Sequence, residues 1–546
     1  MTSPPKNARP PTKSLDKMDS NPTSLKSQSA WLLFAKVVGF AISFLLPLLV
    51  VRYFSQEQVG VYRQVFLVIT TANAIIPLGF GASAFYFLSR ETARRPSVIA
   101  NTLVFNFVVG AAAFLTLYFY PQLLGNIFQS DELTQFAPKI GVIIWLWIFS
   151  TFLDTVAIAN REAKTATALI IFAQLTKTIF MVTAVIIFTT VESFIYAAMA
   201  QAFLQSIVLL AYANSRFPTF WTAFDFQFLR RQLFYALPFG LAGLFWTLQY
   251  DVHNYFVGYR FTHAEFAIYS YGCFELPLIG MLMESVTAVL IPRMSELQSR
   301  DDRPEMLRLL TRTMQKLAFF YFPIYIFLMI TAQTFVTTLF TRNYAASVPI
   351  FVINITLIPS YIMVNDSIIR AYQELGRFLL ILRVFIFVGL ISALYFGIQH
   401  FDLRGMIAIV VVTSLIDRLV SAAVVIKKVG AGKRDLPLLT DVGKTALASL
   451  FAGVFTYVFY WQFQSAIFDW SVNFINTVFP LSKDSLVNFL AGSAVLASCA
   501  LIFAPLYLLS ANFFGIIETS EKEKIREFWR KVLRRSVEPL PLTSEK

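Results

Sequence analysis

Long apolar segments alternate with short polar ones along the whole chain. Each apolar segment is about 20 residues or longer, which is the length that a helix needs to cross a bilayer, whereas the strands of a membrane barrel are ~10 residues long with alternating polarity. The pattern predicts an all-α polytopic membrane protein with about 14 transmembrane helices. We place these helices at residues 29–52, 61–88, 98–120, 138–158, 166–189, 192–214, 231–258, 264–291, 315–340, 346–371, 377–398, 405–427, 441–463 and 485–511.

The composition supports a lipid environment. Hydrophobic residues make up 57% of the 546 residues and charged residues 14%, against roughly 25% charged residues in a soluble domain. The mean hydropathy is +0.64. The net charge of +13 does not indicate a nucleic-acid partner, because most of the excess falls in loops and tails on one side of the predicted membrane.

Lysine and arginine are unevenly distributed between the polar segments. With the N-terminus inside, the inside loops and tails, counted with the adjoining helix ends, hold 34 of the 45 basic residues, and the outside loops hold 7. The remaining four lie within helices. Because basic residues are enriched on the cytoplasmic side of membrane proteins, we predict that both termini are cytoplasmic.

Two polar regions flank the predicted helices. Residues 1–28 are rich in Pro, Ser, Thr and Lys, which predicts a disordered cytoplasmic tail. Residues 519–535 contain a capping-box pattern, Ser520 with Glu523, followed by apolar residues at 3-1-3-1 spacing among Lys and Arg. This pattern predicts a basic amphipathic helix that lies on the cytoplasmic leaflet or packs against an inside loop.

The sequence contains an internal repeat. The segment RYFSQEQVGVY, starting at Arg52, recurs as YRFTHAEFAIY, starting at Tyr259, and each follows one long apolar helix and opens another. We therefore predict two six-helix lobes of the same topology, residues 29–214 and 231–427, with a substrate site between them as in parallel-repeat transporters. The last two predicted helices, residues 441–511, lie outside the repeat.

Charges at membrane depth are candidate functional residues, because each costs several kcal/mol unless it faces protein or water. Lys36, Arg63, Asp251 and Glu284 lie in the first two predicted helices of each lobe, on faces that otherwise carry small and polar residues. We predict that these four residues line a hydrated substrate cavity. The alternative is that the small residues serve helix packing and that each charge pairs once or reaches the interface.

Other polar residues within the predicted helices are weaker candidates. Asp417 and Arg418 are adjacent on one predicted helix, so their side chains point in different directions. The residues that we predict to have a coupling or secondary role are Asn73, Asn254, Glu275 and Lys177.

Motifs of common enzymes and metal sites are missing from the sequence. It contains no HExxH, paired CxxC, GxxxxGK[ST] or dinucleotide-binding GxGxxG motif. Its two cysteines and three histidines do not form a disulfide framework or a metal-ligand pattern. We therefore expect no catalytic residue, no metal and no cofactor.

Two segments resemble a known family. LLVVRYFSQEQVGVYRQVFLVITTANAIIPLGFGASAFYF and DVHNYFVGYRFTHAEFAIYSYGCFELP resemble the starts of the two lobes of polysaccharide (O-antigen type) flippases in the MATE-like multidrug/oligosaccharidyl-lipid/polysaccharide exporter superfamily. The resemblance covers about residues 29–430, and its degenerate Arg, Gly, Tyr and Pro patterns do not name a substrate. The charged pattern early in the first helix of the lipid II flippases is absent, because this chain has GFAISF there.

This resemblance implies export of a polyprenyl-diphosphate-linked oligosaccharide across a bacterial-type cytoplasmic (inner) membrane, for O-antigen, lipopolysaccharide or exopolysaccharide synthesis. It implies a monomeric transport unit in contact with membrane lipid and with a polysaccharide polymerase or export machinery. Lys36 and Arg63 would then hold the diphosphate by charge-assisted hydrogen bonds. Asp251 and Glu284 would bind a coupling proton or sodium ion, or form salt bridges with the two cations.

Two other functions remain open at this point. A cation-coupled drug or small-molecule exporter would share the architecture, but its cationic substrates favour an excess of acidic residues in the cavity. A membrane glycosyltransferase, polymerase or ligase would use the same lipid-linked sugars, but such enzymes need a larger outside loop with catalytic acids or bases. The predicted outside loops are short.

Overall fold

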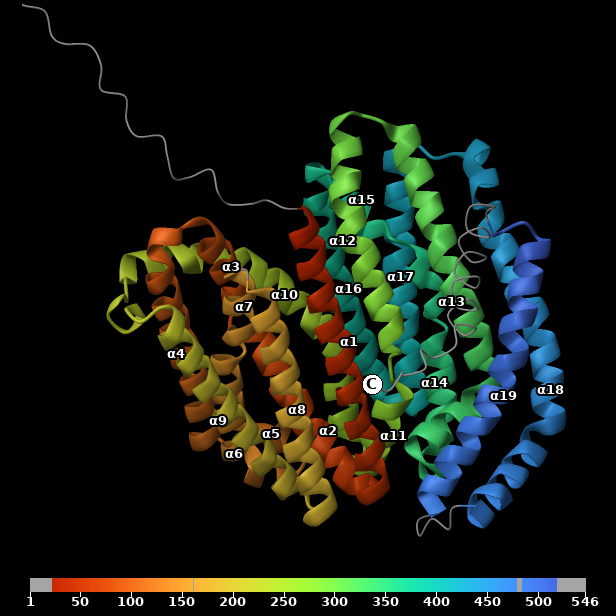
Figure 1. Cartoon of the computed structure of the whole chain (residues 1–546), viewed down its shortest axis with the longest axis horizontal. Coiled ribbons are helices and arrows are strands. Elements are labelled where there is room, and N and C mark those ends of the chain that lie inside the picture. The colour runs from red at the N-terminus through yellow and green to blue at the C-terminus, as the bar shows by residue number, and fades with distance from the viewer. Residues whose placement is uncertain (1–21, 161, 479–483, 518–546) are drawn as a thin grey trace, which may run out of the picture. The chain divides into compact units, whose positions relative to one another are not determined.

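The structure is a computed structural model that describes residues 22–160, 162–478 and 484–517, and their regular structure is helical throughout (Figure 1). The predicted tail up to residue 21 and the predicted amphipathic helix at 519–535 lie outside the described residues. The helices are α1 (Pro22–Tyr53), α2 (Gln56–Ile75), α3 (Phe80–Arg90), η1 (Thr92–Arg94), α4 (Arg95–Phe119), α5 (Gln122–Phe128), α6 (Asp131–Ser150), α7 (Phe152–Ala159), α8 (Ala163–Ile187), α9 (Val191–Arg216), η2 (Phe220–Thr222), α10 (Phe226–Arg260), α11 (His263–Gly272), α12 (Pro277–Ser299), α13 (Arg303–Phe340), η3 (Arg342–Ser347), α14 (Val348–Ile355), η4 (Ile358–Ile362), α15 (Asn365–Ile369), α16 (Gln373–His400), α17 (Leu403–Val429), η5 (Lys433–Leu439), α18 (Thr440–Val478) and α19 (Asp484–Phe513).

Eleven helices in the described residues are long and apolar enough to cross a membrane, and the bent pair of α2 and α3 makes twelve if it is one span. The predicted fold class, an all-α polytopic membrane protein, is confirmed. The predicted segments 29–52 and 231–258 coincide with α1 and α10, which are not among these spans, so the count of 14 stays a prediction. Because α1 begins at Pro22, residues 22–28 are helical, whereas the sequence analysis places them in the tail.

Four predicted helices are interrupted, and the mildest break divides segment 138–158 at Thr151, between α6 and α7. Segment 61–88 is divided into α2 and α3, which are bent by 44° at a break where Leu78 and Gly79 have φ values of 48° and 74°. Segment 264–291 is divided into α11 and α12, and Pro277 occupies the first position of α12, where its missing N–H leaves no hydrogen bond unmade. Segment 346–371 is made of short pieces, from α14 to α15.

The chain divides into two compact units. The first contains the residues up to Val50, Ile69–Leu123 and Thr134–Leu244, and the second contains Val51–Val68, Leu124–Leu133 and the chain from Phe245 onward. This division differs from the predicted lobes, because Val51–Val68 and Leu124–Leu133 group with the second unit. The two six-helix lobes therefore remain a prediction.

Each unit has its own apolar core. In the first, Phe87, Ile99, Phe152 and Leu209 are buried together. The second has one core around Phe266 and Tyr269. A further core lies where α18 and α19, blue in Figure 1, pack against α13; its buried members are Ala448, Ala452, Phe503, Tyr507 and Ala511. Alanines on α18 allow the close approach that stabilises helix pairs in lipid.

Candidate functional site

The second unit encloses a cavity of about 540 Å³. Its wall comes from α2, α10, α11, the start of α12, α14, η4, α16 and α17, so segments distant in sequence surround it. The lining includes the charged residues Arg63, Glu275, Arg383, Asp417 and Arg418. Three arginines and two carboxylates at membrane depth make this cavity the candidate substrate site.

Arg63 enters the wall from α2 and is surrounded by tyrosines. Its guanidinium carbon lies 4.4 Å from the ring centroid of Tyr271, and the rings of Tyr271 and Tyr344 are 5.0 Å apart and nearly perpendicular. Arg63 Nε and the hydroxyls of Tyr271 and Tyr344 are buried, and none has a hydrogen-bond partner within the described residues. Of these three residues only Arg63 lines the cavity, so an anionic ligand with acceptor oxygens would be stabilised by its guanidinium.

A second cationic group lies on α16 and α17. Arg383 Nη1 donates to Asp417 Oδ2 at 2.9 Å, and its Nη2 is 3.7 Å from Asp366 Oδ1. The Arg383 guanidinium lies over the Trp246 ring at 5.3 Å, and that of Arg418 lies over the Tyr361 ring at 4.4 Å. Ion pairing and stacking therefore hold both arginines in the cavity wall.

Only some of the site residues predicted from the sequence line this cavity. Arg63, Asn254 and Glu275 line the cavity. Asp251 and Glu284 belong to the same unit but are not among the lining residues. Lys36 lies on α1, and its side chain is outside the described residues.

The face that α10 presents to the cavity explains the position of Asp251. The lining residues of α10 are spaced 3-1-3-1 along the helix: Trp246, Gln249, Tyr250, His253 and Asn254. Asp251 follows Tyr250 by one residue and therefore projects about 100° further round the helix, off this face. On α12 the lining residues are Ile279, Gly280 and Met283, and the lining ends before Glu284.

Two predicted secondary residues lie in the first unit, away from this cavity's lining. Lys177 Nζ lies 4.6 Å from the ring centroid of Trp147, a contact within that unit. Asn73 Oδ1 is buried and has no hydrogen-bond partner in the described part of the chain. Asn73 and Lys177 therefore belong to a different unit from Arg63 and do not line this cavity.

The sequence analysis underrated Asp417 and Arg418. The lining residues of α17 are Ile407, Val410, Ser414, Asp417 and Arg418. This i, i+3, i+7 spacing forms one helical face, and a face is wide enough to include two adjacent residues. The charge pattern alone could have indicated these residues, but their pairing with Arg383 depends on tertiary structure.

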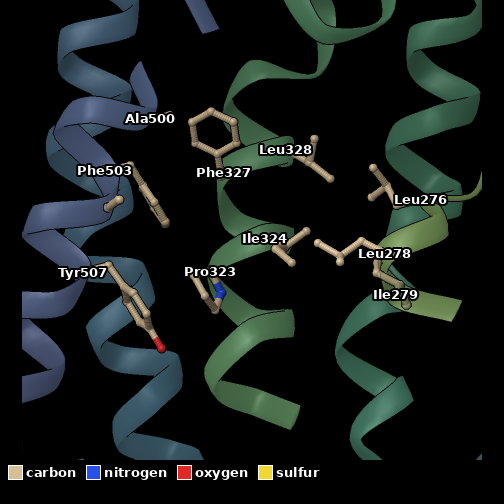
Figure 2. A pocket seen from close by; sticks show the side chains of 11 residues that line it. Leu276, Leu278, Ile279, Pro323, Ile324, Phe327, Leu328, Ala500, Phe503 and Tyr507 are labelled. Carbon is tan, nitrogen blue, oxygen red and sulfur yellow. The ribbon is translucent and has the colours of Figure 1, made fainter. Parts of the chain in front are cut away.

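A smaller pocket of about 290 Å³ adjoins the cavity (Figure 2). Its side chains come from the start of α12, from α13 and from α19, and Phe327, Leu328 and Phe503 lie around the same space. Leu276 and Ile279 line both the pocket and the cavity. An apolar site thus lies next to a charged one, and the two share Leu276 and Ile279 as lining residues.

A family model described as "Polysaccharide biosynthesis protein" matches residues 49–349, which is more than half of the chain. The chain belongs to this family of polysaccharide biosynthesis proteins. The family match includes Arg63, Asn254 and Glu275 but ends before Arg383, Asp417 and Arg418. No curated protein sequence matches the chain significantly.

Solved structures show which fold this family member has. A lipid II flippase, MurJ, in an inward closed conformation matches with a TM-score of 0.61 and 16% identity over 89% of this chain and 98% of that one. An inward-facing multidrug resistance MATE family transporter of the MOP superfamily matches with a TM-score of 0.57 and 13% identity, over 72% of this chain and 98% of that one. A MOP superfamily transporter from Pyrococcus furiosus matches with a TM-score of 0.53 and 15% identity, over 74% of this chain and 96% of that one.

At these identities the likeness shows the fold, which is that of MOP-superfamily transporters. The resemblance to polysaccharide flippases of the MATE-like superfamily, carried by residues 48–87 and 251–277, is confirmed. With the apolar helices of the described residues, it makes the chain a multi-pass membrane protein.

Proposed function

We propose that this protein is a flippase, and not an enzyme, that moves a polyprenyl-diphosphate-linked oligosaccharide across the bacterial-type cytoplasmic membrane by alternating access. The observation that carries the proposal is that a charged cavity and an apolar pocket lie next to each other and share the lining residues Leu276 and Ile279. A lipid-linked sugar needs both, because its headgroup cannot cross ~30 Å of hydrocarbon unaided and its tail must stay out of water. The family's link to polysaccharide biosynthesis supports this substrate class.

The proposed arrangement assigns one role to each region. Arg63 holds the diphosphate by charge-assisted hydrogen bonds, and Lys36 is proposed as a further cation for the anionic headgroup. Asp251 and Glu284 belong to the same unit but do not line this cavity, and we assign to them the binding of a coupling cation. The glycan belongs to a cell-surface polysaccharide pathway, with a polymerase or export machinery as downstream partner and both termini on the cytoplasmic side.

A cation-coupled drug exporter of the same fold is the second candidate. The charge of the cavity argues against it, because the arginines Arg63, Arg383 and Arg418 outnumber the carboxylates Glu275 and Asp417. A cavity with excess positive charge favours an anionic ligand over a cationic one.

Flipping by the purified protein in liposomes tests the proposal. The substrate is a labelled polyprenyl-diphosphate oligosaccharide, supplied with and without an imposed potential or ion gradient. The double variant Lys36→Ala/Arg63→Ala is expected to lower the flipping rate about tenfold or more, because each lost charged hydrogen bond contributes ~1.5–3 kcal/mol. Arg300→Ala, at a side chain with 66% exposure, is the control. Normal flipping by the double variant at normal abundance would refute the diphosphate role.

Filling the apolar pocket tests the place of the lipid chain. Ala504 lines the pocket, whereas Ala497 is exposed on the same helix and does not line it. Ala504→Phe is expected to weaken binding of polyprenyl diphosphate about tenfold, because the loss of two buried CH₂ groups costs ~1.6 kcal/mol. Ala497→Phe should bind as the wild type does. Equal affinities of the two variants in a detergent-solution binding assay would contradict this location.

A further inference from the structure

The cavity presents accessible aromatic rings on α10. Trp246 and Tyr250 are one helical turn apart, and both line the cavity. Their exposed fractions are 59% and 51%, although they are among the largest side chains of the wall. Tyr361, from η4, adds a third ring to the lining.

These rings differ from the tyrosines around Arg63. Tyr271 and Tyr344 are fully buried, and their rings pack against each other. They therefore have no free ring face, and neither of them lines the cavity. Trp246 and Tyr250 instead offer ring surface to a ligand in the cavity.

Side-chain amides accompany the exposed rings. Gln249, Asn254 and Asn354 line the same cavity, and within the described residues their side chains take part in no hydrogen bond, ion pair or ring contact. An amide offers two N–H donors and a carbonyl acceptor. A lipid chain would leave these groups unsatisfied, whereas a ligand with many hydroxyl groups would pair with them.

Saccharides combine the two properties that this wall matches. The C–H face of a pyranose carries slight positive charge, and the face of an aromatic ring is negative, so the two pack face to face. The hydroxyl groups at the edge of the sugar are donors and acceptors for amides. Apolar rings together with a few convergent polar groups are also the usual lining of a small-molecule site.

The arginines of the second cationic group keep two of these rings in place. Arg383 is fixed by Asp417 and stacks on Trp246, and Arg418 stacks on Tyr361. Side chains that are ordered before binding lose less entropy when the ligand arrives. The rings of Trp246 and Tyr361 are therefore preorganised for ligand binding.

From these contacts we propose that Trp246, Tyr250 and Tyr361 form a saccharide-binding wall that takes sugar residues of the lipid-linked substrate and determines which glycan is carried. The proposal rests on the proposed flippase function and deepens it. The wall acts on the glycan, whereas Arg63 acts on the diphosphate.

The test compares two lipids in proteoliposomes that contain the full chain. One is the pool of lipid-linked oligosaccharides extracted from cells that make the protein, and the other is polyprenyl diphosphate without sugars. Trp246→Ala/Tyr361→Ala is expected to slow flipping of the glycosylated pool about tenfold and to change flipping of the sugar-free lipid less than about twofold. Trp246→Phe/Tyr361→Phe should restore most of the rate, because the ring faces return. The matched control is Trp461→Ala on α18, at an indole that is 70% exposed and lines neither the cavity nor the apolar pocket.

Equal loss for both lipids, or no loss for either, would overturn the saccharide-binding wall. If the wild type moves neither lipid, the flippase proposal is refuted, but this result alone does not refute the saccharide-binding wall. The wall is then judged by calorimetric binding of the free oligosaccharides, released from the same pool by mild acid, to the purified protein. Binding that is about tenfold weaker in Trp246→Ala/Tyr361→Ala supports the wall, and no binding to the wild type overturns it.

Discussion

Replacement of Asp417 by alanine is expected to lower the free energy of unfolding by about 3 kcal/mol, because it leaves the Arg383 guanidinium without its nearest counter-charge. The two side chains are mostly buried, with exposed fractions of 11% and 18%, and their closest atoms are 2.9 Å apart. Asp366, at 3.7 Å from Arg383, compensates only in part, which places the cost at the lower end for a broken buried pair.

Equilibrium unfolding in mixed micelles with increasing sodium dodecyl sulfate measures this cost. The control is Glu296→Ala, because Glu296 pairs with Arg293 and Arg300 where all three side chains are exposed; a surface pair contributes at most about 1 kcal/mol. The double variant Arg383→Gln/Asp417→Asn should regain most of the loss, since no uncompensated charge is left. A loss in Asp417→Ala no larger than in Glu296→Ala would show that the pair is solvated and not buried.

The helices could be predicted from the sequence because the apolar composition and the length of each segment are enough to indicate a helix in lipid. An apolar run of about 20 residues is helical in lipid whatever its neighbours are, and all fourteen predicted segments coincide with helical residues of the described chain. The breaks were harder to predict. Pro277 marks the start of α12, and Pro77 and Gly79 flank the left-handed Leu78 at the other break, but transmembrane helices tolerate both residue types, so neither residue alone predicts a break.

The candidate site was predicted only in part, for a geometric reason. A helical wheel groups residues of one helix, and it therefore found Arg63 and Asn254, but it does not show which face meets which neighbour. Asp251 was predicted to line the cavity, although α10 turns Trp246 and Tyr250 toward it. The pairing of Arg383 with Asp417 joins two helices, so no periodicity within either one reveals it.

The break between α2 and α3 is held by a close backbone contact in the first unit. A Cβ atom at Gly79 would lie 2.6 Å from the Gly240 nitrogen, and a Cβ atom at Gly240 would lie 2.8 Å from the Leu78 Cα. Both distances are shorter than carbon atoms tolerate, and the neighbouring atoms are backbone, which cannot move aside as a side-chain end does. Gly79 also needs its positive φ of 74°, which glycine adopts without steric cost.

Gly240→Ala is therefore expected to lower the free energy of unfolding by about 3 kcal/mol, at the upper end for an overpacked site. Gly243→Ala, one turn later on α10, is the matched control, because a Cβ atom there meets nothing within 4 Å. Alanine is the better helix former by ~0.8–1 kcal/mol, so the control should be unchanged or slightly stabilised, and the two variants should differ in sign. The same detergent titration measures both. If Gly240→Ala is as stable as Gly243→Ala, then the backbone of α10 does not pack on Leu78, and the bend between α2 and α3 must have another cause. If the signs differ as expected, the bend is fixed by a contact that allows only glycine at residue 240.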